Sequence, residues 1–301
     1  VPGHRNLAFT GQVETQAPKG TMGTLVLDPT NITVATGGTA TAAQVDQFAD
    51  PDCAPGGCTI APATINANAN ITLQANNDIT VSNAIAKTNA GRTLTMQAGR
   101  NIILNANVGT TNAAISMTAN DAGAGAGRAA GAGSISGAGN VSSGNGAINL
   151  TLGTNAGGAG SINLTGVVTS SGTTTINAGA ANNATLNNAA NNFGTVAVTS
   201  GNNVTVRDTN ALVLGTSTVS GNLNVTTGGA VTQSGALAVT GLTTVAASAN
   251  NITLTNAAND FSTVGITSGN NVALRDANAL DLAASTINGT LAVTTAGAIT
   301  Q

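Results

Sequence analysis

The chain has 301 residues, of which only 6% are charged and 1% are aromatic, whereas about a quarter of an average globular protein is charged. Its formal net charge is −3, with eight Lys and Arg in all, so the chain offers no basic surface for phosphates and nucleic-acid binding is not expected. Because Trp and Tyr are absent, a wide aromatic core is excluded, and a narrow core of Val, Ile, Leu and Ala is expected.

Residues 1–62 form the first predicted region. Strand-like runs occur at 23–27 and 32–34. Residues 40–62 are the least repetitive stretch and contain three of the six prolines. We expect an irregular excursion from the regular structure there, with a short helix within 41–48.

The two cysteines, Cys53 and Cys58, lie close together in this excursion. Their spacing suits a local disulfide loop, as in exported proteins, and two free thiols are the alternative. The only histidine is His4, so the cysteines lack the partners that a zinc site would need. No metal and no cofactor is expected.

Residues 63–301 form the second predicted region, a succession of short strands. Apolar and polar residues alternate, as at 71–73 and 94–96, and such runs recur roughly every eight residues. Residues 252–301 repeat residues 184–233 at an offset of 68, with 32 of 50 positions identical. A long repeat of short strands is typical of a chain that grows by stacking.

The predicted fold is therefore all-β, a right-handed parallel β-helix of about a dozen coils with roughly 20–25 residues in each. On this plan the 68-residue period divides into three coils of about 22–23 residues. Asn pairs at 202–203 and 270–271 precede strands. We expect them at corners, where Asn tolerates left-handed backbone conformations.

One charged pair recurs within the repeat: Arg207-Asp208 returns as Arg275-Asp276. With three coils between them, both pairs would project from the same face, about 14 Å apart along the rod. They are candidates for a surface charge row that binds a ligand. The alternative is a pair of solvated ion pairs with little energetic worth.

Ten Asn-X-Ser/Thr triplets occur, and N-glycosylation is the functional hypothesis for them. Chance is the alternative, because the chain is rich in Asn and Thr. The candidates named here are Asn31, Asn149, Asn203 and Asn251.

The sequence contains few side chains that could act in catalysis. His4 stands alone near the start of the chain, and Asp50 and Asp52 are the densest acidic pair. A catalytic triad or a carboxylate dyad is hard to assemble from these groups, so no enzyme activity is expected.

Three segments resemble the large filamentous-haemagglutinin-like exoproteins: GTLVLDPTNITV at 23–34, NITLQANNDITV at 70–81 and LTMQAGRNIILNA at 94–106. The resemblance implies a secreted bacterial protein, exported by the two-partner route through an outer-membrane barrel transporter. It also implies a β-helical rod on the outer cell surface, with the chain being a piece of a longer protein.

The expected function is thus a structural and binding rod of a surface adhesin, acting in attachment to cells or surfaces or in biofilm contact. Its receptor is not defined by the sequence, and self-association is a further expectation. Two alternatives remain open: an ice-binding β-helix, which needs a regular Thr array, and a β-helical polysaccharide-degrading enzyme, which would use Asp50 or Asp52.

Overall fold

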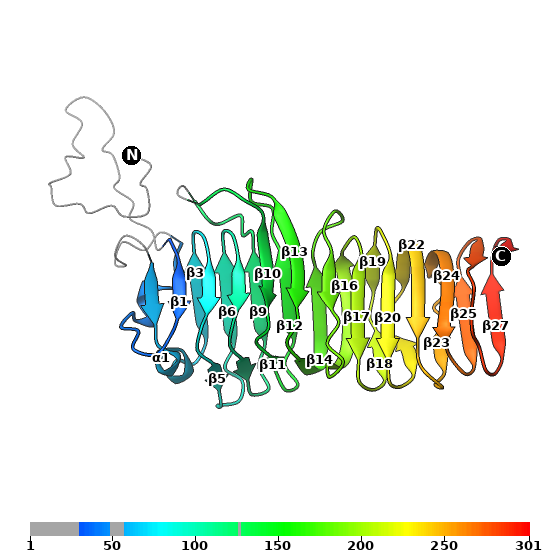
Figure 1. The fold of residues 1–301 in the computed structure, drawn as a ribbon, viewed down its shortest axis with the longest axis horizontal. Coiled ribbons are helices and arrows are strands. Elements are labelled where there is room, and N and C mark those ends of the chain that lie inside the picture. Colours follow the sequence, from blue (N-terminus) through cyan, green and yellow to red (C-terminus); the bar gives the residue numbers. More distant parts are fainter. Residues whose placement is uncertain (1–29, 49–56, 126–127) are drawn as a thin grey trace, which may run out of the picture.

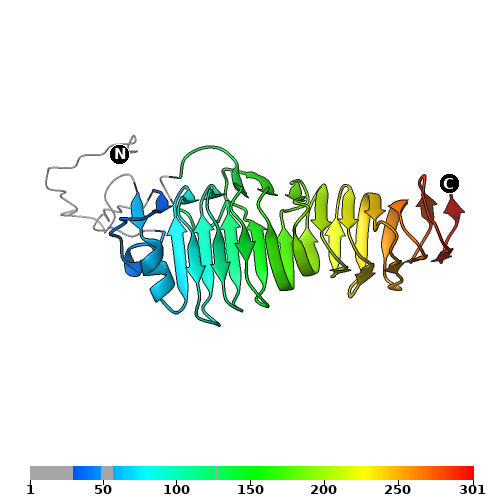
Figure 2. The same ribbon diagram turned by 60° about the horizontal axis from the view of Figure 1, so that its bottom comes forward.

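The computed structural model describes residues 30–48, 57–125 and 128–301. Within these ranges the chain winds into a rod of about 12 coils (Figure 1). Strands of successive coils lie side by side and run in the same direction, which Figure 2 shows from a second side. The prediction of an all-β parallel β-helix of about a dozen coils is confirmed.

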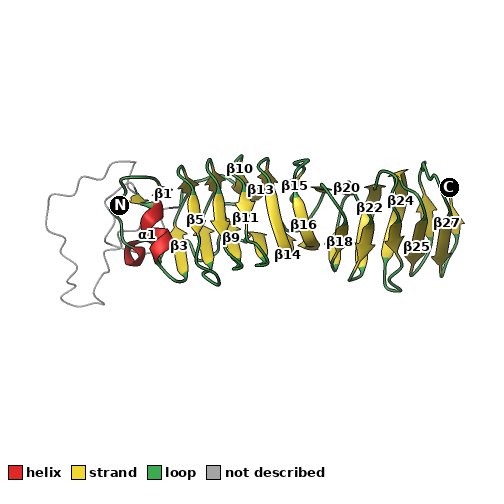
Figure 3. Ribbon diagram, turned by 90° about the horizontal axis from the view of Figure 1, so that it is seen from below, coloured by secondary structure: helices red, strands yellow, loops and turns green. Residues whose placement is uncertain are grey.

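Helical structure in the described residues is confined to the end of the rod that holds the first coils (Figure 3). A 3-10 turn covers Ala42–Gln44, so the helix predicted within 41–48 is shorter than expected. Helix α1 covers Pro62–Ala67 and begins with a proline, whose fixed φ suits the first helical position.

The excursion predicted near residues 40–62 contributes a strand to the stack. Strand β2 (Cys58–Ile60) pairs in parallel with β1 (Ile32–Val34) and forms the edge of a sheet. The excursion therefore returns to the rod before α1 begins.

Two 14-stranded sheets run along the rod. Sheet A contains, in spatial order, β2, β1, β4 (Ile79–Val81), β7 (Ile102–Leu104), β10 (Gly133–Gly137), β13 (Ala159–Leu164), β15 (Ala184–Leu186), β17 (Val204–Asp208), β20 (Leu223–Thr227), β22 (Leu237–Ala246), β24 (Asp260–Ser268), β26 (Leu280–Leu282) and β28 (Ile299–Thr300), with β19 (Ser217–Val219) paired to β22.

Sheet B contains, in spatial order, β3 (Ile71–Ala75), β6 (Leu94–Ala98), β9 (Ile115–Ala119), β12 (Ile148–Leu152), β14 (Val168–Asn177), β16 (Asn192–Ser200), β18 (Leu212–Leu214), β21 (Val231–Gln233), β23 (Ile252–Leu254), β25 (Val272–Asp276) and β27 (Leu291–Thr295). Three short strands form a third face in the earlier coils and join this sheet through β14: β5 (Ile85–Lys87), β8 (Val108–Thr110) and β11 (Val141–Ser142).

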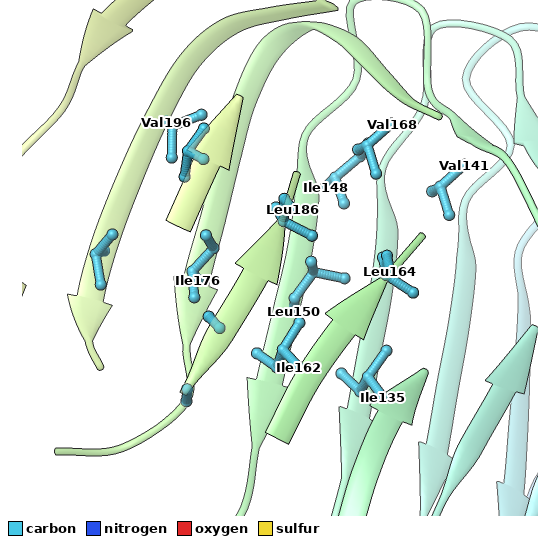
Figure 4. Close-up of a cluster of buried hydrophobic side chains, with 14 of the residues drawn as sticks. Ile135, Val141, Ile148, Leu150, Ile162, Leu164, Val168, Ile176, Leu186 and Val196 are labelled. Carbon is cyan, nitrogen blue, oxygen red and sulfur yellow. The ribbon is translucent and has the colours of Figure 1, made fainter. Parts of the chain in front are cut away.

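The core is built from inward columns of apolar side chains (Figure 4). Alternation along each strand turns every second side chain inward, and parallel pairing in register places it against its counterpart on the next coil. One column of sheet A, in which each side chain is at most 2% exposed, comprises Ile79, Ile102, Ile135, Ile162, Ala184, Val204 and Leu223. Small aliphatic side chains suffice because the space between the sheets is narrow.

The corner asparagines act mainly through their side chains. The Asn203 Oδ1 accepts a hydrogen bond from Asn222 N of the next coil (3.0 Å), and the Asn271 Oδ1 accepts one from Thr290 N (3.1 Å). Neither Asn pair predicted at a corner has a positive φ, whereas Asn112 and Asn120 do. The corners were predicted correctly, but their stabilisation comes from side-chain bonds between coils.

The repeat spans about three and a half coils. In sheet A, positions 184, 204, 223 and 243 pair in succession, so three coils lead from position 184 to position 243. In sheet B, positions 174, 196, 214 and 233 pair in succession, so three coils span the same number of residues there as in sheet A. The position that repeats 184 is 252, which lies about half a coil beyond 243. The predicted division of the repeat into three coils is therefore wrong.

As a consequence, equivalent strands of the two repeats lie in different sheets. Strands β16 and β18 lie in sheet B, and their equivalents β24 and β26 lie in sheet A. Conversely, β17 lies in sheet A and its equivalent β25 in sheet B. The rod thus shows the same sequence on opposite faces, half a turn apart.

The half-turn offset can be measured with paired spin labels at Thr205 and Ala273, which are equivalent outward positions of β17 and β25. Opposite faces place the labels about 30 Å apart, from about 17 Å along the axis, the ~10 Å between sheets and the label lengths. A single face would give about 15 Å. Labels at Thr205 and Thr244, two coils apart in one column, are the short-distance control. A short distance for the first pair would contradict the offset.

Candidate functional site

The two Arg-Asp pairs end equivalent strands on different sheets. Arg207 and Asp208 are the last residues of β17 in sheet A, and Arg275 and Asp276 are the last residues of β25 in sheet B. The charge row predicted along one face is therefore wrong, because the half-turn offset separates the pairs.

Within each pair the aspartate is buried and the arginine is exposed. Asp208 and Asp276 are each 2% exposed. Asp208 accepts hydrogen bonds from the backbone nitrogens of Phe193 and Asn210, both at 3.3 Å. In the second repeat, Phe261 and Asn278 donate to Asp276 at 2.8 and 3.3 Å. The aspartates thus hold a corner of the coil.

Burial raises the pKa of the Asp208 carboxyl above its ordinary value, and the backbone hydrogen bonds from Asn210 and Phe193 offset part of this rise. The carboxylate therefore faces the protein, and the neighbouring guanidinium faces solvent. The two groups do not form an ion pair, since the ion pair of the described residues joins Arg100 and Asp78.

A hollow of about 240 Å³ lies beside Arg207. Thr226, the register partner of Arg207 on the next coil, lines it together with Thr209 and Ser248. One cation, several hydroxyl groups and Asp208, whose carboxylate accepts two backbone hydrogen bonds, line this space. The cation and the hydroxyl groups can donate hydrogen bonds to an anionic oxygen.

A buried asparagine that bonds to the backbone recurs at a different corner of the coil. The Asn191 side chain is fully buried; its Oδ1 accepts from Val168 N (2.8 Å) and its Nδ2 donates to Leu186 O (3.0 Å). Asn259 makes the same two contacts with Leu237 N and Leu254 O. Sequence reasoning missed these residues, although a polar position identical in both repeats could have indicated them.

A shallow groove of about 400 Å³ runs along the third face, across β5, β8, β11 and the start of β14. The outward positions in register there are small: Ala86, Gly109, Ser142 and Thr169. The lining has no charged side chain, so the groove offers shape and hydrogen bonds but no ionisable group for chemistry.

The earlier coils contain a polar cluster around Asp78. The Asp78 carboxylate accepts from Arg100 Nε and Nη2 at 2.9 and 2.6 Å and from Asn101 N at 3.0 Å. Burial alone would raise the pKa of Asp78, but the hydrogen bonds from Arg100 and Asn101 and the charge of Arg100 hold it below the ordinary value. Arg128 ties the Gly/Ala-rich loop to the rod through Asn120 Oδ1 (3.0 Å).

Lys87 is an ammonium group buried at the helical end. Its side chain is 1% exposed, and Nζ donates to Ile65 O within α1 (3.0 Å) and to Asn68 O just beyond it (2.8 Å). Burial, with a smaller effect from Arg92, lowers the pKa of Lys87. Lys87 therefore holds the C-terminal end of α1 against β5 rather than serving a surface site.

The predicted disulfide and the weak catalytic candidates remain predictions. Cys58 begins β2, but Cys53 lies outside the described residues, as do His4, Asp50 and Asp52.

The four glycosylation candidates all bridge coils through their side chains. Asn149 and Asn203 use their amide nitrogens to bind Ser116 Oγ and Asn183 Oδ1, both at 3.1 Å. Asn31 Oδ1 accepts from Asp78 N, and Asn251 Oδ1 accepts from Asn271 N, each at 3.2 Å. Glycosylation stays a prediction, and it would have to displace or coexist with these bonds.

Across residues 30–48, 57–125 and 128–301, no three His, Cys, Asp or Glu side chains lie close enough to hold a metal ion. In the same ranges no helix has the length and apolar character needed to cross a membrane.

Comparison with known families identifies the repeat. Residues 154–200, 201–268 and 269–301 each match the family described as "Repeats of unknown function (DUF5649)". The middle match has the same length as the period found in the sequence. The chain is thus a repeat protein of the parallel β-helix class. No curated protein and no solved structure matched it.

Replacing the buried amide in Asn191→Ala should destabilise the rod by about 2–3 kcal/mol, because Val168 N and Leu186 O lose their partner inside the core. Chemical denaturation measures the loss, and amide exchange at Val168 should accelerate. Asn187→Ala, at a nearby exposed position, is the matched control. Equal stability of the two variants would show that the buried amide does not hold the corner.

The Asp78 carboxylate should make the earlier coils acid-sensitive. Its pKa is lower in the folded protein than the ordinary 3.8, so its stabilising contribution is present above that value and is lost as the pH falls through the folded pKa. Asp78→Asn should cost about 1–2 kcal/mol at pH 7 and should lose less further stability between pH 5 and pH 2 than the wild type. Asp46→Asn, at an exposed site, is the control. Parallel pH profiles for wild type and Asp78→Asn would refute this role.

Proposed function

We propose that the chain is a structural and binding rod of a secreted bacterial surface adhesin, which mediates attachment to cells or surfaces or contact within a biofilm. Export would use an outer-membrane barrel transporter of the two-partner type. This part of the proposal rests on the resemblance of three segments, including 70–81 and 94–106, to filamentous-haemagglutinin-like exoproteins.

The observation that carries the proposal is the uninterrupted stack of coils with the same repeat on both faces. A stack of this kind is long and stiff for its number of residues, because each coil is bonded to both neighbours. It can hold a distal element away from a cell and can offer many equal, weak contacts, whose combined strength exceeds that of each one.

Self-association is also part of the proposal. Only 6% of the residues are charged and the formal net charge is −3, so little electrostatic repulsion opposes contact between neighbouring rods.

A second candidate, ice binding, has one observation in its favour. An outward column of sheet B contains hydroxyl or amide side chains on five successive coils: Thr72, Thr95, Ser116, Asn149 and Thr175. The column is mixed, and Asn149 bonds to Ser116 within it, so fewer of its polar groups are available to order water. Thermal hysteresis of the purified chain would favour this candidate, and its absence would leave the adhesin proposal.

Attachment can be measured with fluorescent beads coated with the purified chain. We expect several-fold more beads to stay on epithelial monolayers or polystyrene under flow than beads coated with albumin, since many equal contacts act together. Beads coated with the chemically unfolded chain are the matched control for composition. Equal retention of folded-chain and albumin beads on all surfaces would contradict the proposal.

A further inference from the structure

We propose that Arg207 and Arg275 are two copies of one carboxylate-binding site, which displays a single guanidinium on each of the opposite faces of the rod and takes the uronate residues of an acidic polysaccharide. The inference deepens the adhesive role proposed above and rests on it, because it names the chemistry of one surface that such a rod would recognise.

Cations are scarce on this part of the shaft. Arg207 and Arg275 are the only Lys or Arg residues in positions 129–301 of the sequence. Both are exposed, and neither guanidinium forms a hydrogen bond or an ion pair with the described residues. Any anionic ligand that binds a cation on this part of the shaft must use one of these two groups.

The aspartates that follow the two arginines do not pair with them. Strand alternation turns Asp208 and Asp276 inward, where they accept backbone hydrogen bonds. Each arginine therefore keeps its charge and its donors for a ligand, although a carboxylate follows it directly in the sequence. A solvated ion pair, the alternative reading of the motif, is not formed.

The hollow beside Arg207 suits one sugar unit. Thr209, Thr226 and Ser248 contribute hydroxyl groups to a space of about 240 Å³ beside Arg207. Asp208 also lines this space, but its carboxylate accepts hydrogen bonds from the backbone nitrogens of Phe193 and Asn210. This is smaller than a pocket for a drug-sized ligand and suits a single unit of a polymer. A guanidinium binds a carboxylate through two parallel hydrogen bonds, and the hydroxyls can bind ring hydroxyls. The absence of aromatic side chains in the lining disfavours neutral sugars, which bind largely by stacking.

The second copy keeps the essential pair. Arg275 has Thr294 as its register partner, just as Arg207 has Thr226. Thr295 bonds to Gly297 O (2.7 Å) in the way that Thr227 bonds to Gly229 O (2.6 Å). Ala277 replaces Thr209, so the Arg275 copy lacks that hydroxyl and should bind more weakly.

Because of the half-turn offset, one rod carries the two arginine sites on opposite sides. The two guanidiniums face away from each other, about 17 Å apart along the axis, so two polymer chains can bind one rod on opposite sides. Each contact alone is weak, but a rod with two sites cross-links the polymer.

The test uses the purified chain with polygalacturonate as the probe and neutral dextran as the matched control polymer. Calorimetry measures binding, and light scattering measures cross-linking. We expect the wild type to bind polygalacturonate and not dextran. Arg207→Gln and Arg275→Gln should each keep binding but lose cross-linking, and the double variant should bind at least tenfold more weakly. Arg92→Gln, which removes the same charge elsewhere, should behave as the wild type.

Two results would overturn the inference: unchanged polygalacturonate binding by the double variant, or an equal loss in Arg92→Gln, which would indicate general charge attraction. Thermal melting confirms that the variants are folded. Failure here is distinguishable from failure of the adhesive role, because beads coated with the double variant would still attach to cells or polystyrene if only the polysaccharide site were wrong.

Discussion

The structure depends on one interaction, the parallel pairing of each coil with the coil before it in a fixed register. This pairing satisfies most backbone polar groups along both sheets, so side chains are needed for that purpose mainly at the corners. It also places like residues above one another, which turns a modest set of Val, Ile, Leu and Ala into continuous columns such as Ile79, Ile102, Ile135 and Ile162. The low charge and the scarcity of aromatic residues follow from this plan, since small aliphatic side chains fill most of a narrow interior, with Phe193 and Phe261 as buried rings.

Polar residues in this fold are mostly joints between coils. Asn203, Asn271, Asp208 and Asn191 all bond to backbone groups of a neighbouring coil. An exposed polar side chain that is already bonded along the rod has little left to offer a ligand. The groups that remain free, above all Arg207 and Arg275, are for that reason the informative ones for function.

The fold class could be predicted because the two-residue alternation of apolar and polar side chains and the long repeat are both visible in the amino-acid sequence. The number of coils per repeat could not be predicted, because a period of this length divides about equally well into three longer coils or three and a half shorter ones. Only the register of positions 184, 204, 223 and 243 decides between them. The Arg-Asp motif was found, but its placement on one face failed with the coil count. Asp208 points inward because of the inward–outward alternation along β17. The sequence did not predict this, because an error of one position in that alternation exchanges the inward and outward side chains.

Because each repeat advances the rod by an extra half turn, the direction in which later parts of the rod face depends on whether the number of repeats is odd or even. Adding or deleting one repeat unit would turn everything beyond it to the opposite side of the rod, whereas adding two would restore the original direction. Homologous rods with odd and even repeat counts would therefore point the same terminal element to opposite sides. Length variation in such a family would then change orientation as well as reach.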